Sequence, residues 1–324
     1  MVQLKMQCEI CGNKENSRNY KVKEMMFGFR DTFNYFECSY CGCLQISEIP
    51  KNMSKYYPSK YYSFQKKIII RENQIKSFFR KHRDISAITG KGLIGTITSK
   101  FFPASTFFTH LRNVDINLKS KILDVGCGTG ILLNILSNVG FENLLGIDPY
   151  IENDIINKKG LMILKKNIHE LEENFELIIF NHSFEHISDP IKTIKKVSEL
   201  LLENGVCLIR APTTSSYAWK KYRHNWVQID APRHFFIYSI ESIKILANQA
   251  GLTLKNIIYD STSLQFWGSE QYVNNIPLCS SISYRNNPHK SIFSSREIAY
   301  FERKAKSLNK KNLGDQATFY LTKI

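Results

Sequence analysis

The segment ILDVGCGTG, residues 122–130, most limits the folds open to this chain. Apolar residues typical of a buried strand lead into Asp124 and then into a turn with glycine at every second position. The segment that follows, GILLNILSNVG, has helical periodicity and ends at Gly140. In a doubly wound sheet, ligands bind beyond the carboxyl ends of the strands. We therefore expect a ligand at this loop.

The alternation of strands and helices continues along the chain. Short apolar strands separated by helices predict a mostly parallel sheet with helices on both faces. A helix is expected across residues 151–159, another after Pro190, and a connecting helix at 65–84. The predicted strands are 121–125, 143–148, 161–164, 175–181, 205–210, 252–259 and 316–323.

Three loop chemistries compete at the first strand. Residues 126–133, GCGTGILL, lack the lysine and the hydroxyl of a phosphate-binding P-loop. A dinucleotide fingerprint requires glycine or alanine where Ile131 stands. The carboxylate of Asp124 would repel a pyrophosphate but attract an ammonium or a sulfonium. Asp148, 22 residues after Gly126, can accept hydrogen bonds from ribose hydroxyls. A cationic adenosine ligand is therefore predicted.

Two C-x-x-C-G knuckles occur near the N-terminus, CEICG and CSYCG, with 26 residues between them. This spacing is typical of a structural zinc ribbon, and the glycines Gly12 and Gly42 allow the sharp turns of such knuckles. Four unrelated buried cysteines are the alternative. The predicted zinc ligands are Cys8, Cys11, Cys38 and Cys41.

The motifs ILDVGCGTG and LLGIDP resemble motifs I and II of class I S-adenosylmethionine-dependent methyltransferases. The segments NHSFEHISDP (181–190) and GVCLIRAP (205–212) resemble that family's regions at the fourth and fifth strands. The resemblance implies a Rossmann-like sheet of seven strands, the last antiparallel. It covers about residues 111–260 and the C-terminal strand. The cofactor-binding residues that it implies are Asp124, Gly126, Cys127, Gly128, Gly130, Asp148, Asn167, Ile168 and Asn181.

The combination of parts has a narrower resemblance. A cysteine-rich start, the aromatic stretch MSKYYPSKYYSF (53–64) and the segment DAPRHFFIYS (230–239) together resemble bacterial methyltransferases of sugar and surface-polysaccharide biosynthesis. This similarity implies a sugar or nucleotide-sugar acceptor, and leaves open whether carbon, oxygen or nitrogen is methylated. The expected domains are a zinc ribbon at 1–50, an aromatic and helical connection at 51–118, and a core at 119–324 with an insertion at 264–315.

Methyl transfer from a sulfonium requires alignment, and a base if the acceptor is a hydroxyl or a carbon acid. His186, next to Glu185 just after the fourth strand, is the first candidate for that base. His234 and Arg233 are candidates for binding a hydroxylated or anionic acceptor. For each of these residues a purely structural role is the alternative.

The net charge of +15 invites a nucleic-acid partner, but Lys and Arg are spread along the whole chain. A solvated basic surface and a small-molecule acceptor are therefore preferred. The N-terminus, MVQLKMQCEI, lacks a signal peptide, and no transmembrane segment is expected, so we place the protein in the cytoplasm. The sequence does not determine an oligomeric state.

Two other functions compete with sugar methylation. An RNA methyltransferase with a zinc finger would suit the basic charge, although NHSFEH differs from the N-P-P-aromatic motif of many base methyltransferases. A non-catalytic scaffold would not need Asp124, the glycine loop and Asp148 intact. Salt-dependent RNA binding would favour the first, and absence of donor binding would favour the second.

Overall fold

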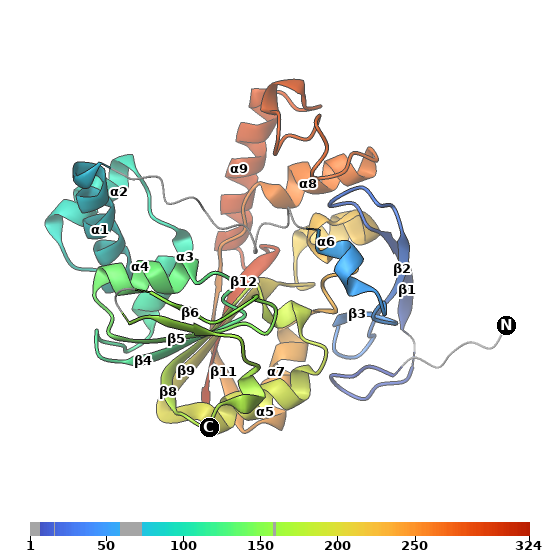
Figure 1. Cartoon of the computed structure of the whole chain (residues 1–324). Coiled ribbons are helices and arrows are strands. Elements are labelled where there is room, and N and C mark those ends of the chain that lie inside the picture. Colours follow the sequence, from blue (N-terminus) through green and yellow to red (C-terminus); the bar gives the residue numbers. More distant parts are fainter. Residues whose placement is uncertain (1–6, 16, 59–72, 158–159) are drawn as a thin grey trace.

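The computed structural model describes residues 7–15, 17–58, 73–157 and 160–324 of the chain. Its largest sheet has eight strands in the order β11-β12-β9-β8-β4-β5-β7-β6 (Figure 1). The strands from β9 to β7 in that order are parallel, whereas β12 is antiparallel to both of its neighbours. The strands are β4 (Lys121–Val125), β5 (Asn143–Ile147), β6 (Ile155–Ile156), β7 (Met162–Leu164), β8 (Phe175–Asn181), β9 (Leu201–Pro212), β11 (Leu252–Tyr259) and β12 (Gln316–Lys323).

The Rossmann-like fold with an antiparallel strand near the edge is confirmed, and β6 adds a two-residue strand to the predicted seven. The helix predicted across 151–159 is wrong, because the described part of that span contains β6 and no helix. Side-chain oxygens of Asp154 and Asn157 accept hydrogen bonds from the backbone N–H groups of Lys165 and Leu161, at 2.7 and 3.1 Å. Together with the antiparallel pairing of β6 and β7, these bonds join the span to the segment that follows it, and its backbone does not form a helix.

Alternating residues of the strands divide the core into two layers. Ile122 packs with α4 (Ile131–Val139), whereas Leu123 packs in the layer that contains α5 (Pro190–Leu200) and α7 (Ile240–Gln249). Because successive side chains of a strand point to opposite faces, each strand contributes to both layers. The buried sheet consequently presents only its strand ends to a ligand.

A second sheet of four strands, in the order β1-β2-β3-β10, lies beside the N-terminal cysteines. Its strands are antiparallel, and the last one comes from the core segment singled out in the sequence. The cysteine module is therefore tied to the core by backbone hydrogen bonds. The strands are β1 (Arg18–Lys23), β2 (Thr32–Glu37), β3 (Leu44–Ile46) and β10 (Phe236–Ile237).

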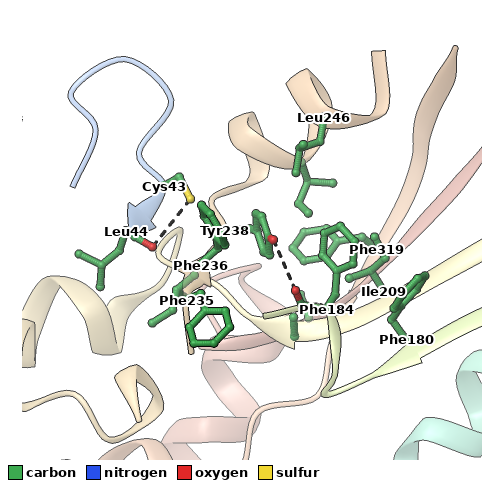
Figure 2. Close-up of a cluster of buried hydrophobic side chains, with 14 of the residues drawn as sticks. Cys43, Leu44, Phe180, Phe184, Ile209, Phe235, Phe236, Tyr238, Leu246 and Phe319 are labelled. Carbon is green, nitrogen blue, oxygen red and sulfur yellow. Dashed lines mark hydrogen bonds between the residues drawn. The ribbon is translucent and has the colours of Figure 1, made fainter. Parts of the chain in front are cut away.

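Figure 2 shows the apolar cluster that joins this module to the large sheet. Cys43 and Leu44 of the module lie in the same cluster as Phe236 and Tyr238, and all four are almost fully buried. The hydroxyl of Tyr238 donates a hydrogen bond to the carbonyl oxygen of Phe184, at 3.5 Å. The segment immediately after β8 is thus packed between the two sheets.

Arg233 is completely buried and links three segments of the chain. Its guanidinium pairs with Glu24 at 2.9 Å and with Asp230 at 2.6 Å, and donates to the carbonyl oxygen of Tyr56 at 3.0 Å. With no exposed surface, Arg233 cannot bind an anionic or hydroxylated acceptor, so that prediction is wrong. No pattern of residues indicates that Glu24, more than two hundred residues away, is its partner.

Replacing Arg233 with methionine should lower the free energy of unfolding by about 3–5 kcal/mol, because Glu24 is left as a buried unpaired charge. Denaturant unfolding measures this change. The double variant Arg233→Met, Glu24→Gln should recover part of the loss. Equal stability of the single variant and the parent would show that the ion pair contributes nothing.

The remaining helices flank this core (Figure 1). The connecting helix predicted at 65–84 appears as α1, which begins later, at Gln74, and ends at Thr89 with Gly90 as its C-cap; residues 65–72 lie outside the described part. Of the described helices, none is long and apolar enough to cross a membrane. They are α1 (Gln74–Thr89), α2 (Leu93–Phe101), α3 (Thr106–His110), α6 (Tyr217–Tyr222), α8 (Leu264–Val273) and α9 (Ser295–Lys310), the last two in the segment 264–315.

Candidate active site

The glycine loop connects β4 to α4 through left-handed backbone conformations. Gly126 and Gly130 have φ values of +71° and +73°. A Cβ at Gly126 would lie 2.5 Å from the Cβ of Ser183, and one at Gly130 would lie 2.1 Å from the Cδ1 of Ile163. Both the backbone conformation and the neighbouring side chains therefore require glycine at these two positions.

Two carboxylates lie at the base of this loop. Asp148 accepts hydrogen bonds from the backbone N–H groups of Gly128 and Tyr150, both at 2.9 Å. The buried carboxylate of Asp124 accepts none from the residues that the structure describes. Burial, and then the charge of Asp148, raise the pKa of Asp124 to about 7. A buried pair of acids that lacks a cation is suited to a positively charged ligand.

A cavity of 480 Å³, here called the Asp124 cavity, opens on one side of the loop. Arg210 of β9 lines it and donates a hydrogen bond to the Oδ1 of Asn181, at 3.1 Å, while pairing with Asp260 at 2.7 Å. Sequence analysis did not identify Arg210, because an arginine at a strand end carries no signal of its own. The other residues that line the Asp124 cavity include Ser105, Phe107, Phe108, Gly126, Cys127, Gly128 and His182.

A second cavity of 490 Å³, here called the Asp148 cavity, lies on the other side of the loop. Asn167 and Ile168 line it together with Asp148. Tyr57, from the aromatic stretch, and Phe235, from the DAPRHFFIYS segment, also line it. Gly126 and His182 belong to both cavities, so the two meet at the glycine loop.

His186 follows β8 and lines the Asp148 cavity. Its Nδ1 lies 2.8 Å from the carbonyl oxygen of Arg233. A carbonyl oxygen can only accept a hydrogen bond, so Nδ1 carries the proton in the neutral ring and Nε2 has the lone pair. Burial, and then the charge of His234, lower the pKa of His186. At neutral pH the side chain can therefore act as a base.

Glu185 and His234 are close to His186, and neither lines the Asp124 cavity or the Asp148 cavity. The rings of His186 and His234 have centroids 4.8 Å apart, and the Nε2 of His234 is 3.9 Å from the Oε1 of Glu185. Burial opposes ionisation of Glu185, but the hydrogen bond from His182 and the nearby histidines outweigh it and lower the pKa to about 2. This carboxylate is fully buried, so it can influence a reaction only through the histidines.

The four cysteines of the two knuckles come together. The Sγ atoms of Cys8 and Cys41 are 3.6 Å apart, those of Cys11 and Cys38 are 3.5 Å apart, and all four lie within 4.8 Å of one another. The side-chain amide of Gln45 donates to the Sγ of Cys8 at 2.8 Å. Tetrahedral zinc with sulfur at about 2.3 Å places its ligands roughly 3.8 Å apart, so the cluster fits that metal.

The comparisons with known proteins concern the large sheet. Residues 104–256 match the family model described as a methyltransferase domain. The ubiquinone biosynthesis O-methyltransferase of Bradyrhizobium diazoefficiens is 23% identical over 45% of this chain and 66% of that protein. The enzyme of the same name from Histophilus somni is 27% identical over 46% of this chain and 72% of that protein. The tRNA U34 carboxymethyltransferase of Campylobacter hominis is 27% identical over 26% of this chain and 33% of that protein.

Among solved structures, a cyclopropane synthase from Mycobacterium tuberculosis has a TM-score of 0.44 and 16% identity, and the alignment covers 76% of this chain and 94% of that one. The matches to the first two relatives cover less than half of this chain, and the chain spans just under two thirds of the length of the first of them. The matched segment holds the strands β4 to β9, the glycine loop and both acids. Residues 104–256, slightly less than half of the chain, are therefore similar to methyltransferase domains.

Proposed function

We propose that this protein transfers a methyl group from S-adenosylmethionine to a hydroxyl or an acidic carbon of a small acceptor, with His186 as the general base. The observation that carries the proposal is the Nδ1 of His186, fixed at 2.8 Å from a carbonyl oxygen. This bond leaves Nε2 as the unprotonated nitrogen of a side chain that lines the same cavity as Asp148. Base and donor site thus share one cavity.

For the donor, the residues of the glycine loop and the two acids provide a fitting environment. Asp148 would bind the ribose hydroxyls, Asn167 and Ile168 would flank the adenine, and Asp124 would face the cationic end of the molecule. Cys127, Gly128, Gly130 and Asn181 complete the predicted set. The bound donor supplies an electrophilic methyl group on a sulfonium, and the protein supplies alignment and charge.

The acceptor that we propose is a sugar or nucleotide-sugar. Histidines and the hydroxyl of Tyr57 are groups that bind sugar hydroxyls, and Tyr57 lies 3.5 Å from the Nδ1 of His186. The names of two relatives describe O-methyltransferases of ubiquinone biosynthesis, which favours oxygen as the methylated atom. A phenolic acceptor is accordingly the competing proposal.

A direct test is incubation of the purified protein with methyl-labelled S-adenosylmethionine and separate pools of nucleotide-sugars, small phenols and RNA. We expect label in a nucleotide-sugar. Label in phenols alone would overturn the sugar assignment, and label in RNA would favour an RNA methyltransferase. Calorimetry with the donor, performed in parallel, establishes whether the cofactor binds at all. Failure to bind would favour a scaffold.

We further propose that Cys8, Cys11, Cys38 and Cys41 bind one structural zinc ion. All four coordination positions are filled by cysteines, so no position remains for a substrate. The second knuckle lies close to the segment 230–239, because the hydroxyl of Ser239 donates to the carbonyl oxygen of Cys41. The metal would thereby hold the module against the segment that carries His234.

Elemental analysis should find one zinc ion per chain. The variant Cys38→Ser should lose most of the zinc and lower the unfolding temperature by more than about 5 °C. Cys279→Ser is the matched control, since Cys279 lies outside the cluster. Full zinc content in Cys38→Ser would contradict the assignment.

A further inference from the structure

The helical hairpin of α1 and α2, residues 74–101, exposes an unusual amount of apolar surface. Eight large apolar side chains on it and just after it are 44–84% exposed to solvent. An exposed apolar patch of this kind on an otherwise polar surface marks an interaction site. In Figure 1 the hairpin lies at the side of the molecule opposite the N-terminal sheet. The exposed residues are Ile75, Phe78, Phe79, Leu93, Ile94, Ile97, Phe101 and Phe102.

The contact between the two helices uses small and hydroxylated residues instead. Gly95 lies so close to α1 that a Cβ there would be 2.0 Å from the carbonyl oxygen of His82. The hydroxyls of Ser86 and Thr96 are hydrogen-bonded at 3.1 Å. A helical pair in water normally packs its apolar stripe inward. Here the stripe points outward, which is the arrangement expected in an apolar environment.

On each helix, the spacing of the exposed apolar residues places them on one continuous face. On α2, Leu93, Ile97 and Phe101 recur every four residues, and on α1, Phe78 and Phe79 follow Ile75 by three and four. Residues at these intervals share one face of a helix. Each helix therefore has one apolar stripe.

The hairpin contains many more basic than acidic residues. Residues 73–103 contain six basic residues and one acidic residue, a formal net charge of +5. The single acid, Asp84, is buried and bonded to the guanidinium of Arg83 at 2.7 Å. Five of the basic residues, Lys76, Arg80, Lys81, Lys91 and Lys100, are exposed. Residues 73–103 therefore have no exposed carboxylate that would repel an anionic surface.

We propose that the α1–α2 hairpin docks on an anionic lipid bilayer. Phenylalanine, leucine and isoleucine side chains enter the boundary between head groups and acyl chains, and the lysines pair with anionic head groups. Single-stranded RNA fits less well, because its bases stack on aromatic rings and would leave Leu93, Ile94 and Ile97 in water. A second copy of the chain would bring two cationic hairpins together.

The hairpin leads directly into the donor side of the molecule. After Pro103 the chain continues into Ser105 and α3, whose Phe107 and Phe108 line the Asp124 cavity. Docking at the hairpin would consequently bring this cavity near the lipid surface. This inference is independent of the acceptor and of the proposed catalytic base.

Sedimentation of the full-length protein with vesicles tests the proposal. Vesicles of phosphatidylcholine with about one third phosphatidylglycerol should bind the protein at least about tenfold more tightly than phosphatidylcholine alone, with weaker binding at high salt. One double variant combines Phe101→Ser with Phe102→Ser, and a second combines Lys91→Gln with Lys100→Gln. Each double variant should weaken vesicle binding about tenfold. The matched control Ile292→Ser, Tyr300→Ser removes two similarly exposed apolar side chains outside the hairpin and should bind normally.

Equal binding to both kinds of vesicle, or normal binding by the hairpin variants, would overturn the proposal. Two results in the absence of vesicle binding would assign the surface to another partner. RNA binding that the same variants abolish would assign it to RNA. Self-association at micromolar concentration that these variants abolish would assign it to a second copy of the chain. Donor calorimetry on every variant separates this result from the proposed function. The hairpin variants should bind the donor normally, whereas loss of donor binding in the parent protein would contradict the proposed function alone.

Discussion

The variant His186→Gln is expected to lower kcat about 100- to 10,000-fold, the usual contribution of a general base. Glutamine can keep a hydrogen bond to the carbonyl oxygen of Arg233 but cannot take a proton. Donor affinity should stay within about threefold, because Asp124 and Asp148 are untouched. Steady-state kinetics and donor calorimetry on the same preparation provide the two measurements.

The pH profile gives this prediction a second readout. A base must be neutral to act, and the pKa of His186 is lowered by burial and by His234. Activity of the parent should therefore rise with pH through a value below the ordinary histidine range, and be level above neutrality. His224→Gln, at an exposed histidine, is the matched control and should leave kcat and the profile unchanged. A fully active His186→Gln enzyme would exclude the assigned base.

Asp124→Asn should weaken donor binding about 100-fold or more. Removing one partner of a buried charged contact costs about 2–5 kcal/mol of binding free energy, because the other charge is left buried and unpaired. Asparagine has nearly the same shape, so the loop should keep its conformation. Calorimetry with S-adenosylmethionine measures the change. Asp115→Asn serves as a control, because Asp115 is an exposed acid outside both cavities. Unchanged affinity in Asp124→Asn would show that the cation binds elsewhere.

Protonation of Asp124 couples this site to pH. Its pKa in the folded protein is about 7, raised by burial and by Asp148. A cationic donor favours the ionised form, so the Kd of the parent should rise about tenfold for each pH unit below 7 and level off above it. Asp124→Asn should remove this dependence.

The raised pKa of Asp124 also affects the stability of the donor-free protein. Donor affinity increases as the pH rises, whereas the free energy of unfolding should decrease. The folded state holds the proton up to about pH 7, whereas an unfolded aspartate loses it near pH 4, so stability without donor falls across that interval. Above pH 7, Asp124→Asn should therefore stabilise the donor-free protein, by an amount on the order of 2 kcal/mol. Thermal unfolding at pH 5 and pH 8 checks this sign.

The sequence alone determined most of the large sheet. Strands 121–125, 252–259 and 316–323 have the predicted bounds, because each is a short apolar run between turn residues. The prediction failed at 151–159, where β6 pairs with β7 and polar side chains bind the backbone of the segment that follows. No periodicity of apolar residues records such bonds.

Within the candidate site, sequence reasoning selected Asp124, Asp148, His186 and His234, and the structure places the first three along two adjoining cavities and the last close to His186. It did not find Arg210 or Ser105, which reach the Asp124 cavity from β9 and from the residue before α3. It also misjudged Arg233. A residue type shows which chemistry is available, but not whether the side chain faces solvent.

Local chemistry therefore decided what could be known in advance. Glycine spacing, acids after strands and cysteine pairs act over a few residues, and their consequences follow from backbone geometry and ligand preference. Only the tertiary structure decided that the cysteine module shares a sheet with β10, that Glu24 neutralises Arg233, and that the apolar stripes of α1 and α2 face outward. Each of these depends on contacts between distant segments, which are selected by packing of the whole chain.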